Sequence, residues 1–192
     1  KHQVKRETVK KKFPDIEDYL ASLELKMTIF EDDKSIIPRM SQMTQKTNQF
    51  NLTTKRYTEV NIQNFINDSN SDVYAFSIAD KFGESGVTGL CIVFDNSKAE
   101  WAEIDTLLMS CRIIGRNIEY AFMDYVIEKT KQKKIHEIKA KYIKTQKNEQ
   151  VKEFYDKCSF NLVNENESVR EYALDTNNYK PRKLNYIEVI NE

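Results

Sequence analysis

The residues best suited to chemistry lie where an apolar run ends, in the stretch LMSCRIIGRN (108–117). A turn at Gly115, between a strand and a helix, can present backbone amides to an anion, because the first amides of a helix lack partners within it. Arg112 begins this turn, and Arg116 would add positive charge. Asn117 is bulky and would crowd a bound phosphate. The stretch predicts either a phosphate-binding turn or an ordinary strand-to-helix corner.

Two carboxylates lie on the strand-like segment before this turn. Period-two alternation places Glu103 and Asp105 on one face, with Ile104 and Thr106 on the other. A carboxylate that faces an apolar cleft has its pKa raised, which suits a general base. Glu103 and Asp105 are therefore candidates for the base. The alternative is a half-exposed strand with two solvated acids.

Cys111 is a candidate nucleophile because it precedes Arg112 near the expected helix start, where a thiol pKa is lowered. His136 is the only histidine of the expected folded part, and nothing in the sequence brings it to Cys111. The default interpretation of Cys111 is therefore a small buried thiol. Two His and three scattered Cys make no zinc ligand set, so no metal is expected.

The composition is that of a globular domain, with 192 residues, 40% of them hydrophobic and 31% charged. Thirty basic residues balance thirty acidic ones and no nucleic-acid motif appears, so neither nucleic acid nor membrane is expected as a partner. Three cysteines without metal-type spacing favour reduced thiols in a cytoplasmic protein. The lysines that crowd residues 129–147 are either a solvated surface or a landing patch for an acidic partner such as a carrier protein.

Alternating strands and helices must position these candidates. Hydrophobic periodicity predicts strands at 25–30, 72–80, 86–95, 102–110, 136–143, 159–165 and 168–175, and helices at 35–50, 58–68, 115–133 and 148–158. A meander followed by strand–helix–strand predicts a mixed central sheet flanked by helices, of the α/β (α+β) class. We expect a basic lead-in and linker helix at 1–22, the domain at 23–178 and a C-terminal tail at 179–192. A start at Lys rather than Met indicates a fragment of a longer protein.

The order of elements, with RIIGRN at the start of the long helix, resembles the GNAT superfamily of N-acetyltransferases. The family turn reads Gln/Arg-x-x-Gly-x-Gly/Ala, which Arg112 and Gly115 match and from which Asn117 departs. The resemblance implies a GNAT (acyl-CoA N-acyltransferase) fold, with coenzyme A, acyl-CoA or phosphopantetheine entering the cleft between the fourth and fifth strands. The residues implied for cofactor binding are Met109, Ser110, Cys111, Arg112, Gly115, Arg116, Asn117 and Asn148.

A second stretch, KNEQVKEFYDKCSFNLV (147–163), resembles the GNAT pattern Asn-x-x-Ala-x-x-Phe-Tyr-x-x-x-Gly-Phe. The match implies that Asn148 bonds pantetheine or its neighbours where the strands splay. It also implies that Tyr155 is the general acid for the leaving thiolate. Val151 stands in place of Ala and Ser159 in place of Gly. The alternative is that Tyr155 is a core aromatic.

A closer resemblance lies in MTQKTNQFNLTTKRYT (43–58), EIDTLLMSCRIIGRNIE and DYLASLELKMTI, which look like FkbH-like proteins of methoxymalonyl- and glyceryl-carrier-protein biosynthesis. The resemblance covers most of residues 18–160. It implies an upstream haloacid-dehalogenase-like domain that passes a glyceryl group to the phosphopantetheine of an acyl carrier protein, with this domain following it. The chain has no Asp-x-Asp-x-Thr motif, so phosphate removal is not expected of it. The residues implied for the acyl or pantetheine cleft are Asn48, Gln49, Asn51, Thr53, Thr54, Arg56 and Tyr57.

The alternative for these seven residues is that their amides and hydroxyls satisfy buried loop backbone. Three functions remain open from the sequence. The first is an acyltransferase domain that uses coenzyme A or carrier-bound pantetheine. The second is a non-catalytic module that docks the carrier protein for the haloacid-dehalogenase-like domain. The third is a small-molecule amine N-acetyltransferase.

Overall fold

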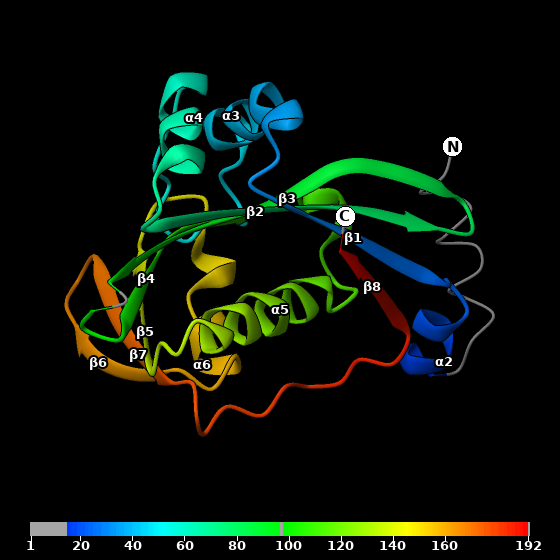
Figure 1. Cartoon of the computed structure of the whole chain (residues 1–192). Coiled ribbons are helices and arrows are strands. Elements are labelled where there is room, and N and C mark those ends of the chain that lie inside the picture. The colour runs from blue at the N-terminus through cyan, green and yellow to red at the C-terminus, as the bar shows by residue number, and fades with distance from the viewer. Residues whose placement is uncertain (1–14, 97, 192) are drawn as a thin grey trace.

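The computed structural model describes residues 15–96 and 98–191, and its centre is an eight-stranded mixed sheet (Figure 1). The strand order is β6-β7-β5-β4-β3-β2-β1-β8. The strands are β1 (Leu25–Glu31), β2 (Ser71–Asp80), β3 (Gly83–Asn96), β4 (Trp101–Met109), β5 (Glu137–Ile143), β6 (Asn161–Glu165), β7 (Val169–Asp175) and β8 (Ile187–Asn191). Neighbours are antiparallel except β4 with β5 and β1 with β8, which are parallel. The predicted mixed sheet is confirmed.

Helices cover both faces of this sheet (Figure 1). Two of them, α3 (Ile37–Lys46) and α4 (Glu59–Asn67), contact β3 and β2 on one face. On the opposite face lie α5 (Ile118–Gln132) and the short α6 (Phe154–Lys157), while α2 (Ile16–Ala21) precedes β1. Three short 3-10 turns complete the described chain: η1 (Lys34–Ile36), η2 (Cys111–Ile113) and η3 (Glu149–Val151).

Apolar residues are buried on each face, as the periodicity of the strands requires. One cluster fills the space between the sheet and α5, and it includes Met27, Ile29, Phe76, Phe122 and Val126. The other lies beneath α3 and α4 and includes Met40, Met43, Ile62, Ala75 and Leu90. Because β4 contributes Leu107 to the first cluster and Leu108 to the second, it is buried on both faces at its C-terminal end.

The structure differs from the expectations at three places. The helix expected over 35–50 ends at Lys46, because the next residues turn into the sheet. The helix expected over 148–158 is split into η3 and α6. Within the segment expected to be a tail, residues Ile187–Asn191 form β8, which pairs with β1 and extends the sheet by one strand. The basic lead-in at 1–14 lies outside the described residues.

Candidate functional site

The gap between β4 and β5 is the place where the family resemblance implied the pantetheine arm. These two strands pair only from Trp101–Glu137 to Ile104–Ala140 and then diverge. A bulge at Asp105, which has no partner on β3, accompanies the divergence. Parallel strands that separate in this way leave backbone amides and carbonyls without ladder partners, and those groups need other partners when they are buried.

The chain itself supplies these partners. Residues 50–53 lie in the gap, where the amide of Met109 donates to the carbonyl of Phe50 and the amide of Leu52 to that of Leu107, both at 3.0 Å. The amide of Ile143 on β5 donates to the carbonyl of Leu52 at 2.8 Å. We call residues 50–53 the inserted segment. Because it fills the gap, the prediction that coenzyme A or pantetheine enters between the fourth and fifth strands is wrong for this conformation, and the amide of Met109 is not available to a cofactor.

Asn148 holds the inserted segment in place. Its Nδ2 donates to the carbonyls of Asn51 and Ile143, each at 2.9 Å. Its Oδ1 accepts from the amide of Thr145 at 2.8 Å and from the hydroxyl of Tyr142 at 3.2 Å. The side chain is fully buried and all its hydrogen-bonding capacity is used within the protein. The prediction that Asn148 binds pantetheine is therefore corrected to a structural role.

Tyr155, the predicted general acid, is fully buried, and its hydroxyl has no hydrogen-bond partner in the described part of the chain. Burial raises the pKa of this phenol well above its usual value. Its ring packs against Phe154, Phe160 and Tyr172. A general acid must come within hydrogen-bonding distance of its leaving group. The structure therefore places Tyr155 in the core, as the alternative interpretation expected.

The turn after β4 has the backbone that a Gly-containing turn requires. Gly115 has a φ of +85°, and Asn117, at +60°, directly precedes α5. Two of the predicted phosphate ligands are engaged elsewhere. Arg116 pairs with Asp80 at 3.4 Å, and Asn117 Nδ2 donates to the hydroxyl of Tyr186 at 2.7 Å. These contacts correct the expectation that Arg116 and Asn117 face a phosphate.

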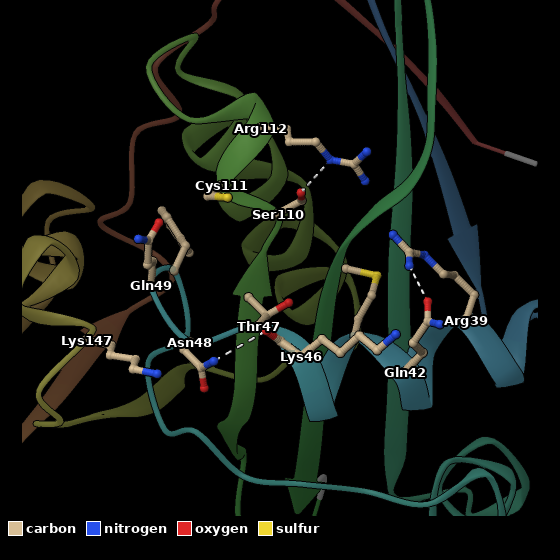
Figure 2. A pocket seen from close by; sticks show the side chains of 12 residues that line it. Arg39, Gln42, Lys46, Thr47, Asn48, Gln49, Ser110, Cys111, Arg112 and Lys147 are labelled. Atoms are coloured by element: carbon tan, nitrogen blue, oxygen red, sulfur yellow. Dashed lines mark hydrogen bonds between the residues drawn. The ribbon is translucent and has the colours of Figure 1, made fainter.

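A cavity of about 600 Å³ opens beside the start of this turn (Figure 2). Ser110, Cys111 and Arg112 line one side of it, and Arg112 is exposed, with its Nε donating to Ser110 Oγ at 3.4 Å. The other sides come from α3, the loop that follows α3 and the loop that follows β5. The remaining lining residues are Arg39, Gln42, Met43, Lys46, Thr47, Asn48, Gln49, Phe50 and Lys147. The cavity thus gathers Ser110, Cys111 and Arg112 of the predicted cofactor set with Asn48 and Gln49 of the predicted substrate set.

The remaining residues of the predicted substrate set stabilise the inserted segment and the loop around it instead. Asn51 Oδ1 accepts from the amide of Thr54 at 2.8 Å, and Thr53 Oγ1 donates to the carbonyl of Asp105 at 2.9 Å. Arg56 donates to the carbonyl of Thr47 at 3.0 Å and also to the side chain of Asn48. For Asn51, Thr53, Thr54 and Arg56 the structure shows loop stabilisation in place of a ligand contact.

The two candidate bases are separated from the cavity. Asp105 is buried, pairs with Lys55, and accepts from the hydroxyls of Tyr57 at 2.7 Å and Thr106 at 2.9 Å. Its carboxylate therefore stabilises the loop that carries Tyr57. Glu103 lines a different pocket, of about 220 Å³, over β5 and β7. Neither carboxylate faces the cavity, so the expectation of a general base on this strand is corrected.

Cys111 is exposed, which corrects the expectation of a small buried thiol. It lines the cavity, but His136 lies elsewhere, with its Nδ1 3.2 Å from Asn177 Nδ2 and its Nε2 3.7 Å from Glu100. A Cys–His pair is therefore absent between these two residues. In the described part of the chain, no group of three or more His, Cys, Asp or Glu side chains is placed to hold a metal.

Sequence reasoning missed the basic residues Arg39, Lys46 and Lys147. A signal for two of them was present, because Arg39, Gln42 and Lys46 follow one another at helical spacing and so lie on one face of α3. Lys147 was counted only as one of many lysines. The contribution of α3 to the cavity depends on how α3 sits against the end of β4, and local patterns do not contain that information.

Comparisons with solved structures place this fold among N-acetyltransferases. A spermidine N-acetyltransferase SpeG chimera from Vibrio cholerae and hSSAT aligns with a TM-score of 0.61 and 12% identity, over 80% of this chain and 97% of that one. Ard1 from Thermoplasma volcanium aligns with a TM-score of 0.61 and 16% identity, over 78% and 97%. PaiA N-acetyltransferase from Thermoplasma acidophilum, solved in complex with coenzyme A, aligns with a TM-score of 0.51 and 16% identity, over 62% and 72%.

The chain therefore has the GNAT fold, and the predicted fold class is confirmed. No protein-family model and no curated protein matches the sequence. Among the described residues, no helix is both long and apolar enough to cross a bilayer.

Proposed function

We propose that this domain is of the acyltransferase type and binds a thioester of coenzyme A or of carrier-protein phosphopantetheine at the cavity beside β4. In this proposal it supports transfer of a glyceryl or other acyl group to an acyl carrier protein, next to a haloacid-dehalogenase-like domain of the same protein. The observation that carries the proposal is the meeting of Ser110, Cys111 and Arg112 with Asn48 and Gln49 in one cavity of about 600 Å³. That volume is in the range of small-molecule sites.

The donor set of the cavity fits the phosphate-bearing end of such a ligand, because the described residues that line it include basic side chains and no carboxylate. A bound thioester would supply an activated acyl carbonyl. Arg112, held by Ser110, would neutralise negative charge at the ligand. Asn48 and Gln49 would donate to its carbonyl or hydroxyl oxygens and so orient the acyl group. No step is assigned to Tyr155, Glu103 or Asp105.

The second candidate is a non-catalytic module that binds the carrier protein and presents its arm to the haloacid-dehalogenase-like domain. Two observations favour it: the inserted segment fills the gap between β4 and β5, and the buried Tyr155 hydroxyl has no hydrogen-bond partner among the residues that the structure describes. A domain that only docks an arm needs neither an open gap nor a general acid. The exposed cavity serves this role as well as it serves catalysis.

A third candidate is amine N-acetylation, which the similarity to solved N-acetyltransferases favours. One neighbour is a spermidine N-acetyltransferase, and another was solved with coenzyme A. Release of free thiol from acetyl-coenzyme A across a panel of amines, including spermidine, tests this candidate. No thiol release with any amine of the panel would rule it out for those acceptors.

A carrier-loading assay with the protein that contains both domains separates the first two candidates. Mass spectrometry would follow the acyl group on the carrier in the parent protein, in Arg112→Ala and in Tyr155→Phe. Loss of loading in Arg112→Ala with retention in Tyr155→Phe supports a site at the cavity without a Tyr155 acid. Unchanged loading in Arg112→Ala would refute the proposed site. Loss of loading in a correctly folded Tyr155→Phe would show that this hydroxyl takes part in the chemistry.

A reducing compartment such as the cytoplasm is part of the same proposal. Cys91, Cys111 and Cys158 are all free thiols, and Cys111 is exposed at the proposed site. An exposed thiol beside cationic groups is prone to oxidation and to disulfide exchange. A location that keeps thiols reduced would preserve the cavity.

A further inference from the structure

Four basic side chains from three segments of the chain line the cavity. Arg39 and Lys46 come from α3, Arg112 from η2 and Lys147 from the loop that follows β5. Figure 2 shows Arg39 and Arg112 extending toward the same part of the cavity, with Lys147 approaching from another side. Among the described residues, no Asp or Glu lines the cavity. This concentration of charge is unexpected in a protein with equal numbers of acidic and basic residues.

None of these four side chains forms an ion pair within the described residues, although many other basic residues of the chain do. Lys55 pairs with Asp105, Lys129 with Glu31, and Lys133 with both Asp72 and Asp95. Cations that share a cavity repel one another unless an anion sits between them. An anion that pairs with these four side chains would therefore come from outside the described residues.

Neutral hydrogen-bond acceptors hold the side chain of Arg39 in place. Arg39 Nε donates to the carbonyl of Val87 at 3.0 Å, and its Nη1 donates to Gln42 Oε1 at 2.5 Å. These bonds fix the direction of the guanidinium, whose planar group of donors matches the oxygens of a phosphate. Arg112 makes a single longer contact, from its Nε to Ser110 Oγ at 3.4 Å. Two guanidinium groups and two ammonium groups form a suitable set for a phosphoryl group.

We infer that Arg39, Lys46, Arg112 and Lys147 bind the phosphoryl group of a phosphopantetheine arm on the α3 side of the inserted segment. This inference rests on the proposed function and assigns part of the site to residues outside the turn after β4. The arm then lies along Asn48, Gln49 and Cys111 and not in the gap between β4 and β5, which the inserted segment fills. The source of the arm is either free coenzyme A or a holo carrier protein.

The test measures calorimetric affinities of the whole protein for pantetheine, 4′-phosphopantetheine, coenzyme A and a holo carrier protein. We expect 4′-phosphopantetheine to bind at least roughly tenfold more tightly than pantetheine, because its phosphate makes charge-assisted hydrogen bonds. The comparison between coenzyme A and the holo carrier identifies the source. Equal affinities for pantetheine and 4′-phosphopantetheine would overturn the inference.

Substitutions of lining residues test where in the cavity the phosphate binds. Arg39→Gln and Lys147→Gln should each remove most of the preference for 4′-phosphopantetheine, whereas Lys144→Gln, an exposed lysine outside the cavity lining, should keep it. Bound ligand should also slow labelling of Cys111 by a maleimide in the parent protein. If coenzyme A binds but neither Arg39→Gln nor Lys147→Gln changes the preference, the inference fails and the proposed function stands. If none of the four ligands binds, the proposed function fails with it.

Discussion

The side chain of Asn148 donates from Nδ2 to the backbone carbonyl of Asn51 at 2.9 Å, which joins the loop after β5 to the segment inserted between β4 and β5. The same Nδ2 also donates to the carbonyl of Ile143, the last residue of β5. Asn148 thus replaces several of the backbone bonds that the diverging strands cannot make with each other. The side-chain amide of Asn148 thus fixes the inserted segment in the gap between β4 and β5, which becomes part of the protein core.

We predict that Asn148→Ala destabilises the protein by about 3 kcal/mol, since it leaves buried carbonyls and the amide of Thr145 without partners. Chemical denaturation followed by circular dichroism measures the change. Asn164→Ala, at an exposed amide on β6 that bonds Glu171, serves as the control and should change stability by less than about 0.5 kcal/mol. Equal denaturation midpoints for Asn148→Ala and the parent protein would contradict the assigned role.

Tyr155→Phe should stabilise the protein by about 1 kcal/mol, because it removes a buried hydroxyl that has no partner among the described residues. Tyr172→Phe is the matched comparison and should destabilise the protein, because the Tyr172 hydroxyl donates to Asp156 Oδ2 at 2.7 Å. Thermal or chemical denaturation of both variants measures the two changes in stability. A destabilised Tyr155→Phe would show that the hydroxyl has a partner, such as a buried water.

The order of elements up to β7 could be predicted from the sequence because most of the strands and the long helix carry a hydrophobic period of their own. The strand β8 could not, because Ile187 is its only buried residue and five residues give too short a pattern. The side chain of Val189 on the same strand is exposed. The place of β8 in the sheet comes from its pairing with β1, across more than 150 residues of sequence.

The candidate site was predicted only in part, for a related reason. The polar residues after Lys46 look like a surface loop, yet Asn51 and Leu52 are fully buried and pair with β4 and β5. Their amides and hydroxyls are satisfied by tertiary partners that no local pattern reveals. Arg112 and Cys111 were found from the residues of the turn and Asn48 through the resemblance to known families, whereas the part that Arg39 and Lys147 play in the cavity becomes apparent only in three dimensions.

Glu119 should make stability depend on pH. It lies in the first turn of α5, burial raises the pKa of its carboxyl, and its Oε2 has no partner within the described chain. The folded protein then holds this proton more tightly than the unfolded chain, so stability falls as pH rises from about 4.5 through the raised pKa. Glu119→Gln should therefore raise the denaturation midpoint at pH 7.5, and this gain should disappear below pH 4.

The control for this prediction is Glu167→Gln at an exposed position, which should leave the pH dependence of the parent protein unchanged. Denaturation midpoints between about pH 4 and pH 8 provide the measurement. A Glu119→Gln variant that loses stability at pH 7.5 would mean that the ionised carboxylate is well paired in the folded protein.

Thiol labelling should distinguish Cys111 from the other two cysteines. Cys111 is exposed, whereas Cys91 and Cys158 are buried and burial raises the pKa of both thiols. We expect one thiol to react rapidly with a maleimide in the native protein, as intact-mass measurement would show. Cys111→Ser should abolish this fast reaction, and denaturant should expose the rest. Fast labelling that persists in Cys111→Ser would contradict the burial of Cys91 and Cys158.

Calorimetric titration of the protein with coenzyme A tests the central claim most directly, with Lys147→Gln compared with Lys144→Gln. Lys147 lines the cavity and Lys144, three residues away, does not. We predict saturable binding at one site that is retained in Lys144→Gln and weakened roughly tenfold or more in Lys147→Gln, as expected for loss of a charge-assisted contact. Absence of binding heat in the parent protein, or equal affinity in the two variants, would contradict it.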